Sequence, residues 1–115
     1  MPTHDRQLQV YARFDARIRA QMKALVTPAL IAEHAANPLG PHSDALARVL
    51  NYFRKQPLPG KYVIVASEPW REYRIGMLSG QRGVPAQIVG EDTWPTEAAA
   101  LHGIFLRRVR ALEHG

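Results

Sequence analysis

The sequence contains no cysteine among its 115 residues. This absence excludes disulfide frameworks, thiolate zinc sites, iron–sulfur clusters and cysteine nucleophiles. The chain also has no run of about 18 apolar residues long enough to cross a membrane, and the start, Met1 to Asp5, lacks the basic region and apolar stretch of a signal peptide. We therefore expect a cytoplasmic protein with no membrane contact.

Acidic residues are scarce relative to basic ones. Ten acidic residues stand against fifteen basic ones, which gives a net charge of +5, and most of the basic residues are arginine. Arginine suits surfaces that bind carboxylates, phosphates or another protein. The apolar fraction of 46% and charged fraction of 22% are those of an ordinary globular domain. A chain of this length forms one domain with little room for a deep active site, which favours a binding or subunit role.

Three helices are predicted in the first half of the chain. Apolar residues recur at three- and four-residue steps from Asp5 to Val26, which is the stripe of an amphipathic helix. Thr27 and Pro28 are suited to begin a second helix that ends near Ala36, before the segment 37–41 (NPLGP). Ser43 is expected to cap a third helix, and the segment 56–60 (QPLPG) is expected to end it. The expected buried stripes are Leu8, Tyr11, Phe14, Ile18, Met22 and Leu25 in the first helix, and Leu46, Val49, Leu50 and Phe53 in the third.

The spacing of the apolar residues changes in the second half of the chain. Residues 61–66 and 73–78 are strand-like runs, and residues 67–72 between them read as a single capped helical turn. Whether residues 86–89 form a third short strand is left open by the sequence. Thr96 caps a last helix whose buried stripe is Leu101, Ile104, Phe105, Val109 and Leu112. The predicted fold class is α+β: three N-terminal helices, a small antiparallel sheet of two or three strands, and one C-terminal helix. We expect a single domain, 1–115, with a helical part (1–57), a small sheet (58–93) and a closing helix (94–115).

No constellation for catalysis or metal binding emerges from the residues. The histidines show no ligand spacing, Glu33 and His34 are adjacent and so point apart on a helix, and His102 is expected to have a hydrogen-bonded structural role. Ser43, Ser67 and Thr96 are expected as helix caps instead of nucleophiles. We therefore predict no catalytic, cofactor-binding or metal-binding residues in this chain, and the adjacent acids 91 and 92 are expected in a solvated turn.

Two kinds of partner remain open from the residues. Aromatic and basic residues lie close together at 52–55 and 61–62, which is compatible with a small basic nucleic-acid-binding or regulatory domain. The same residue types anchor protein interfaces. Aromatic and arginine side chains that the helical stripes do not need are the interface candidates, and for Trp70 and Tyr73 the alternative is that they cover an open sheet edge. The candidates are Tyr52, Arg54, Trp70, Tyr73, Arg107 and Arg108.

Several segments resemble a known family. The segments 31–40 (IAEHAANPLG) and 51–57 (NYFRKQP), followed by Gly60-Lys61-Tyr62, Trp70 and Tyr73-Arg74-Ile75, resemble the small (light) subunit of N,N-dimethylformamidase. Thr96-Glu97 and the segment 104–109 (IFLRRV) are similar to the C-terminal segment of that subunit. The likeness spans residues 31 to 110, with a poorer stretch at 79–93.

The resemblance implies a hetero-oligomeric amidohydrolase that hydrolyses dimethylformamide to dimethylamine and formate. It implies that a large catalytic subunit is the partner, and that an iron held by tyrosine and glutamate side chains of the large subunit performs the chemistry. No ligand of that iron is carried over to the present sequence. The small chain is therefore expected to be a non-catalytic accessory subunit.

Overall fold

The computed structural model describes residues 3–56 and 61–114, with side chains from residue 9 onward. The elements, in order, are α1 (Thr3–Leu25), α2 (Pro28–Ala36), α3 (Asp44–Arg54), β1 (Tyr62–Glu68), β2 (Glu72–Met77), β3 (Gln87–Ile88) and α4 (Glu97–His114). The predicted α+β order is confirmed, and the sheet has the larger of the two expected strand numbers, three. The segment 57–60, expected to end the third helix, and the side chain of Leu8 lie outside the described residues.

The predicted helix caps Thr27, Ser43 and Thr96 are confirmed. The hydroxyl of Thr27 accepts a hydrogen bond from the backbone N–H of Leu30 at 3.1 Å, and Pro28 occupies the first turn. Ser43 and Thr96 accept in the same way from backbone N–H groups three residues further on, at 3.3 and 3.1 Å. Each bond satisfies a donor that the first turn of a helix leaves unpaired. Local sequence therefore fixes where α2, α3 and α4 begin.

The sheet has the antiparallel order β1-β2-β3, and its central register pairs Ile64 with Ile75. The prediction of a helical turn over residues 67–72 is wrong: β1 continues to Glu68, and a tight turn leads directly into β2 at Glu72. Ser67 caps no helix. Its hydroxyl instead donates to the carboxylate of Glu72 at 2.6 Å, where a bulge interrupts the register. Polar residues and a proline resemble a helix start, but here they form a hairpin turn.

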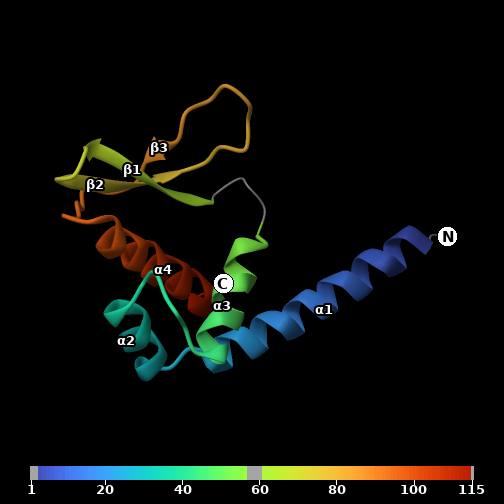
Figure 1. The fold of residues 1–115 in the computed structure, drawn as a ribbon. Helices are drawn as coiled ribbons and strands as arrows, with labels where there is room; N and C mark the ends of the chain where they lie inside the picture. The colour runs from blue at the N-terminus through green and yellow to red at the C-terminus, as the bar shows by residue number, and fades with distance from the viewer. Residues whose placement is uncertain (1–2, 57–60, 115) are drawn as a thin grey trace.

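The core lies among α2, α3 and α4, with α4 between the sheet and the other helices (Figure 1). The predicted stripes supply most of it. The buried cluster consists of Leu30, Leu46, Val49, Phe53, Phe105, Val109 and Leu112. The sheet is joined to α4 through Trp94, which pairs with Tyr73 by two backbone hydrogen bonds of 2.8 and 2.9 Å. The indole of Trp94 packs so closely on Gly103 that a Cβ there would lie 2.6 Å from Cζ2.

The N-terminal half of α1 projects from the rest of the molecule, as Figure 1 shows. Among the described side chains of α1, those of its C-terminal part pack: Met22 and Leu25 lie against the core, and Arg19 and Lys23 donate to carbonyl groups at the end of α4. The radius of gyration is accordingly 16.3 Å, against about 13 Å for a compact domain of this length. None of the described helices is long and apolar enough to cross a membrane.

Candidate pocket and interaction surfaces

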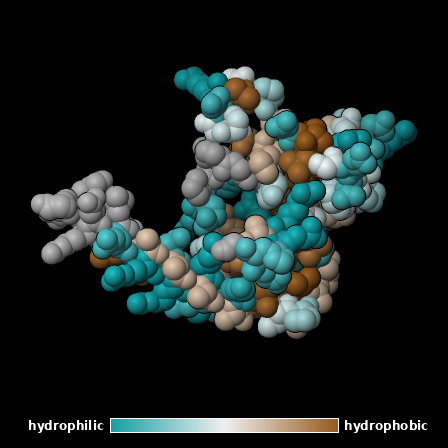
Figure 2. All heavy atoms as spheres, turned by 180° about the vertical axis from the view of Figure 1, so that it is seen from behind, coloured by the Kyte–Doolittle hydropathy of each residue, from teal (hydrophilic) through white to brown (hydrophobic). Residues whose placement is uncertain are grey.

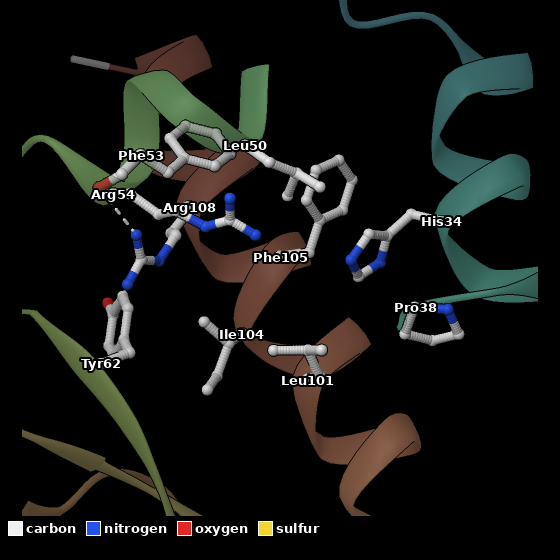
Figure 3. A pocket seen from close by; sticks show the side chains of 10 residues that line it. All are labelled: His34, Pro38, Leu50, Phe53, Arg54, Tyr62, Leu101, Ile104, Phe105 and Arg108. Carbon is white, nitrogen blue, oxygen red and sulfur yellow. Dashed lines mark hydrogen bonds between the residues drawn. The ribbon is translucent and has the colours of Figure 1, made fainter. Parts of the chain in front are cut away.

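A half-open pocket lies where α2, α3, α4 and β1 meet (Figure 3). Its volume is about 150 Å³. The lining residues are His34, Pro38, Leu50, Phe53, Arg54, Tyr62, Leu101, Ile104, Phe105 and Arg108. In Figure 3, Arg54, Tyr62 and Arg108 enter from one side, whereas His34 and Pro38 lie on the other, with the apolar side chains of α4 between them. The pocket thus has a basic end and an apolar body.

Arg108 supplies the main charge of the basic end. Its Nη1 donates to the backbone carbonyl of Phe53 at 2.9 Å, and its Cζ lies 5.8 Å from the centre of the Phe53 ring. Its Nε is buried and has no hydrogen-bond partner among the described residues. Burial lowers the pKa of the Arg108 guanidinium, because removing a charge from water disfavours the ionised form. A buried guanidinium still remains charged at neutral pH.

The opposite end carries a pair of histidines. His34 is 1% exposed, and its Nδ1 lies 2.8 Å from the Nδ1 of His102. The His34 ring stacks on Phe105 at a centroid distance of 4.2 Å. Burial, with the nearby His102 and His42 as smaller contributors, lowers the pKa of His34 to about 4. His34 is therefore neutral at physiological pH, and the predicted hydrogen-bonded role of His102 is confirmed.

The histidine pair was not visible in the sequence, because α2 and α4 bring together residues that lie far apart along the chain. His42 joins them, with its ring centre 5.9 Å from that of His34. Glu33, the neighbour of His34, points away as expected: its carboxylate accepts from the backbone N–H and the hydroxyl of Ser43, both at 2.7 Å. Within residues 3–56 and 61–114, no group of three or more histidine, cysteine or acidic residues is arranged to hold a metal ion.

The six predicted interface residues do not form one patch. Trp70 is 89% exposed at the tip of the β1–β2 hairpin, whereas Arg54 is exposed at the end of α3. The seven residues of β1 separate these positions by about 20 Å. Tyr52, Arg107 and Arg108 are half-buried. The expectation that Tyr73 stands at the surface is wrong: it is 7% exposed, and its backbone forms an isolated bridge with Trp94.

Tyr11 and Phe14, which were expected in the buried stripe of the first helix, are instead exposed together with Val10. Val10, Tyr11 and Phe14 on α1 are 60%, 67% and 61% exposed. We call residues 9–14 the α1 arm. Figure 2 shows α1 standing away from the body of the molecule when it is seen from behind. The helical period correctly predicted the stripe, but the stripe is longer than the surface that this chain offers to cover it.

The sequence matches known proteins over nearly its whole length. Residues 9–115 match the family described as the N,N-dimethylformamidase alpha subunit. The alpha subunit of N,N-dimethylformamidase from an Alcaligenes species is 39% identical over 110 residues, which cover 91% of this chain and 82% of that relative. The alpha subunit from Paracoccus aminophilus is 36% identical over 110 residues, covering 91% of this chain and 77% of the relative.

Both relatives are alpha subunits, so their names place them in a class of chains that form part of a larger enzyme. The present chain belongs to the N,N-dimethylformamidase alpha-subunit family. This confirms the resemblance found in the sequence. The match also begins at residue 9, so it includes the α1 arm, which lies before the segments that carried the resemblance.

Proposed function

We propose that the chain is an accessory small subunit that binds the large catalytic subunit of an amidohydrolase of the N,N-dimethylformamidase type. Membership of the alpha-subunit family supports this proposal. The assembled enzyme would hydrolyse a linear amide to an amine and formate. The basic surface of this chain, with a net charge of +5, favours a partner whose docking surface is acidic.

The chemistry is assigned to the large subunit. Amide hydrolysis needs a group that polarises the carbonyl and a group that activates water. The histidine pair is a poor candidate for a general base, because the Nδ1 atoms are used in bonding each other and His34 is buried with a pKa of about 4. The iron implied by the family resemblance belongs to the large subunit. The role of the small chain is then to bind and stabilise that subunit.

The α1 arm is the observation that carries the proposal. Its apolar side chains continue the stripe whose C-terminal part, Met22 and Leu25, packs on the core of this chain. Three large apolar residues left in water at adjacent helical positions indicate a surface that a partner covers. Arg13 and Arg17 stand exposed beside them and can form paired hydrogen bonds with carboxylates. A helix of this kind docks by laying its apolar face into a groove.

Trp70 offers a second contact point. Its φ of 71° lies in the left-handed region, which costs a residue with a side chain on the order of 1 kcal/mol, and its side chain is 89% exposed. Strained backbone and an exposed indole bring no gain to the isolated chain. Tryptophan is among the residue types that most often dominate binding energy. We therefore propose that the hairpin tip inserts Trp70 into the large subunit.

Co-purification of substituted chains with the large subunit tests both contacts. The double variant Tyr11→Ala/Phe14→Ala and the variant Trp70→Ala should each weaken association by at least about 30-fold, which corresponds to about 2 kcal/mol. Their thermal melting should be unchanged, because the substituted side chains are exposed. Leu39→Ala is the matched control, since Leu39 is 74% exposed but lies on neither surface. Normal affinity in both test variants would show that neither surface is the interface.

A further inference from the structure

We propose that the pocket between α2, α3, α4 and β1 binds a small free monocarboxylate with a short apolar chain, whose carboxylate is held by Arg108. This site lies in the small chain itself and does not depend on the amide chemistry of the large subunit. The proposal is based on the charge, the shape and the lining of the pocket.

The charge of the pocket is uncompensated. Two arginines line it, and none of the ten described residues of the lining is acidic. Where the described residues do form ion pairs, these join Arg48 to Asp44 and Arg74 to Glu72, away from the pocket. A partly desolvated guanidinium without an anion is unfavourable, and a carboxylate ligand removes that cost. A ligand with a negative charge therefore gains more here than a neutral one of the same shape.

The hydrogen-bonding geometry of Arg108 fits a carboxylate. Nη1 is engaged with the carbonyl of Phe53, so one side of the guanidinium fork is held in place. The Nε is buried and has no partner among the described residues, so a ligand does not reach it in this conformation. Nη2 is the donor left for a charge-assisted hydrogen bond to a carboxylate, with Arg54 as the second cation of the pocket. The bond to Phe53 fixes the orientation of the fork before a ligand arrives.

The body of the pocket fits a short apolar chain. Leu50, Leu101, Ile104 and Phe105 supply aliphatic and aromatic walls. A cavity of about 150 Å³ in an apolar surrounding admits a molecule of about six non-hydrogen atoms, the size of benzene or butyrate. His34 at the far end is neutral at physiological pH, so it presents no second charge to the ligand tail. The Arg108 end would then hold the carboxylate and the His34 end the tail.

A titration of the full-length chain with butyrate tests the site. We expect saturable shifts of backbone amide signals around the pocket, with a Kd of about 1 mM. Butyramide, the neutral analogue, should bind at least about tenfold more weakly, because it forgoes the charged fork. Arg108→Gln should weaken butyrate binding to a similar extent. Arg110→Gln is the matched control, since Arg110 is exposed on the same helix outside the pocket.

A second variant tests the site independently, in case Arg108→Gln does not fold. Leu101→Trp should fill the pocket from the half-buried wall of α4 and abolish butyrate binding while leaving the amide spectrum folded. Equal affinity for butyrate and butyramide, or normal butyrate binding in both variants, would overturn the proposal. So would the absence of any shift at about 20 mM butyrate.

The same titration in the complex with the large subunit identifies the source of the carboxylate. Retained butyrate binding supports a free ligand, whereas loss of binding would mean that an acidic side chain of the partner occupies the pocket and would overturn the assignment. Because the first titration uses the small chain alone, its result stands whether or not the chain binds a large subunit.

Discussion

The Nδ1 atoms of His34 and His102 face each other at 2.8 Å, which leaves room for one proton between them. One ring must donate its Nδ1–H while the Nδ1 of the other accepts, so at least one of the two rings is neutral. Protonating both rings would place two N–H groups opposite each other beside the buried ring of Phe105. The hydrogen bond between α2 and α4 is therefore lost once both rings are protonated.

The fold should lose stability in mild acid. The pKa of His34 is lowered from 6.5 to about 4 in the folded chain, so between these values the unfolded chain binds more protons than the folded one. Stability is therefore complete above pH 6.5 and falls as the pH drops toward 4. Between pH 7.5 and 5 we expect a loss of about 2 kcal/mol in the free energy of unfolding, measured by urea denaturation.

His34→Phe should remove most of this acid dependence, because the ring is replaced by one that cannot titrate and that still stacks on Phe105. His114→Gln is the control, since His114 is exposed near the end of α4. If His34→Phe loses as much stability between pH 7.5 and 5 as the parent chain, the histidine pair is not the origin of the effect.

Gly103→Ala should destabilise the chain, although alanine normally stabilises a helix relative to glycine by about 1 kcal/mol. The new Cβ would lie 2.6 Å from Cζ2 of Trp94, and Trp94 is held by its two backbone bonds to Tyr73. We expect a loss of about 1–3 kcal/mol in thermal or urea unfolding.

Relief of the clash distinguishes this packing account from a general effect of the substitution. In a Trp94→Phe background, where the smaller ring leaves space, Gly103→Ala should be neutral or stabilising. A loss of equal size in both backgrounds would show that a clash with Trp94 is not the reason why alanine at position 103 destabilises the chain.

Nucleic-acid binding should be weak at physiological salt. The arginines lie on α1, α3, the sheet and α4 instead of forming one stripe, and Phe53 is buried in the core. We therefore expect a Kd no tighter than about 1 µM for random single- or double-stranded DNA in a fluorescence titration, with steep loss as salt rises. Submicromolar binding at that salt would favour the nucleic-acid alternative that the sequence left open.

The sequence predicted the helices and strands well where short-range chemistry decides them. A helix begins after each of Thr27, Ser43 and Thr96, because the hydroxyl accepts from a backbone N–H only three residues further on. This contact is local, so the sequence alone predicts it. The turn after β1 was misread, because Ser67 and Pro69 suit both a helix start and a hairpin, and only pairing with β2 decides between them.

The sites depend on long-range contacts, and the sequence predicted them less well. His34 and Arg108 reach the pocket from different helices, and no spacing along the chain relates them. The helical period of α1 correctly predicts an apolar face. Whether Phe14 on that face is buried depends instead on the length of the neighbouring helices, which the period does not give. Arg108 was among the predicted interface residues, whereas Tyr11 and Phe14 of the α1 arm were assigned to a buried stripe.

The central claim, that this chain is an accessory subunit, is tested most directly by mixing it with the large subunit of an N,N-dimethylformamidase from the same source. Light scattering after size-exclusion chromatography would measure the mass of the assembly, with iron and dimethylformamide turnover determined in every fraction. We expect a stable complex, with iron and turnover in fractions that contain the large subunit and none in fractions of the small chain alone. Separate elution of the two chains, or stoichiometric iron with turnover in the isolated small chain, would contradict it.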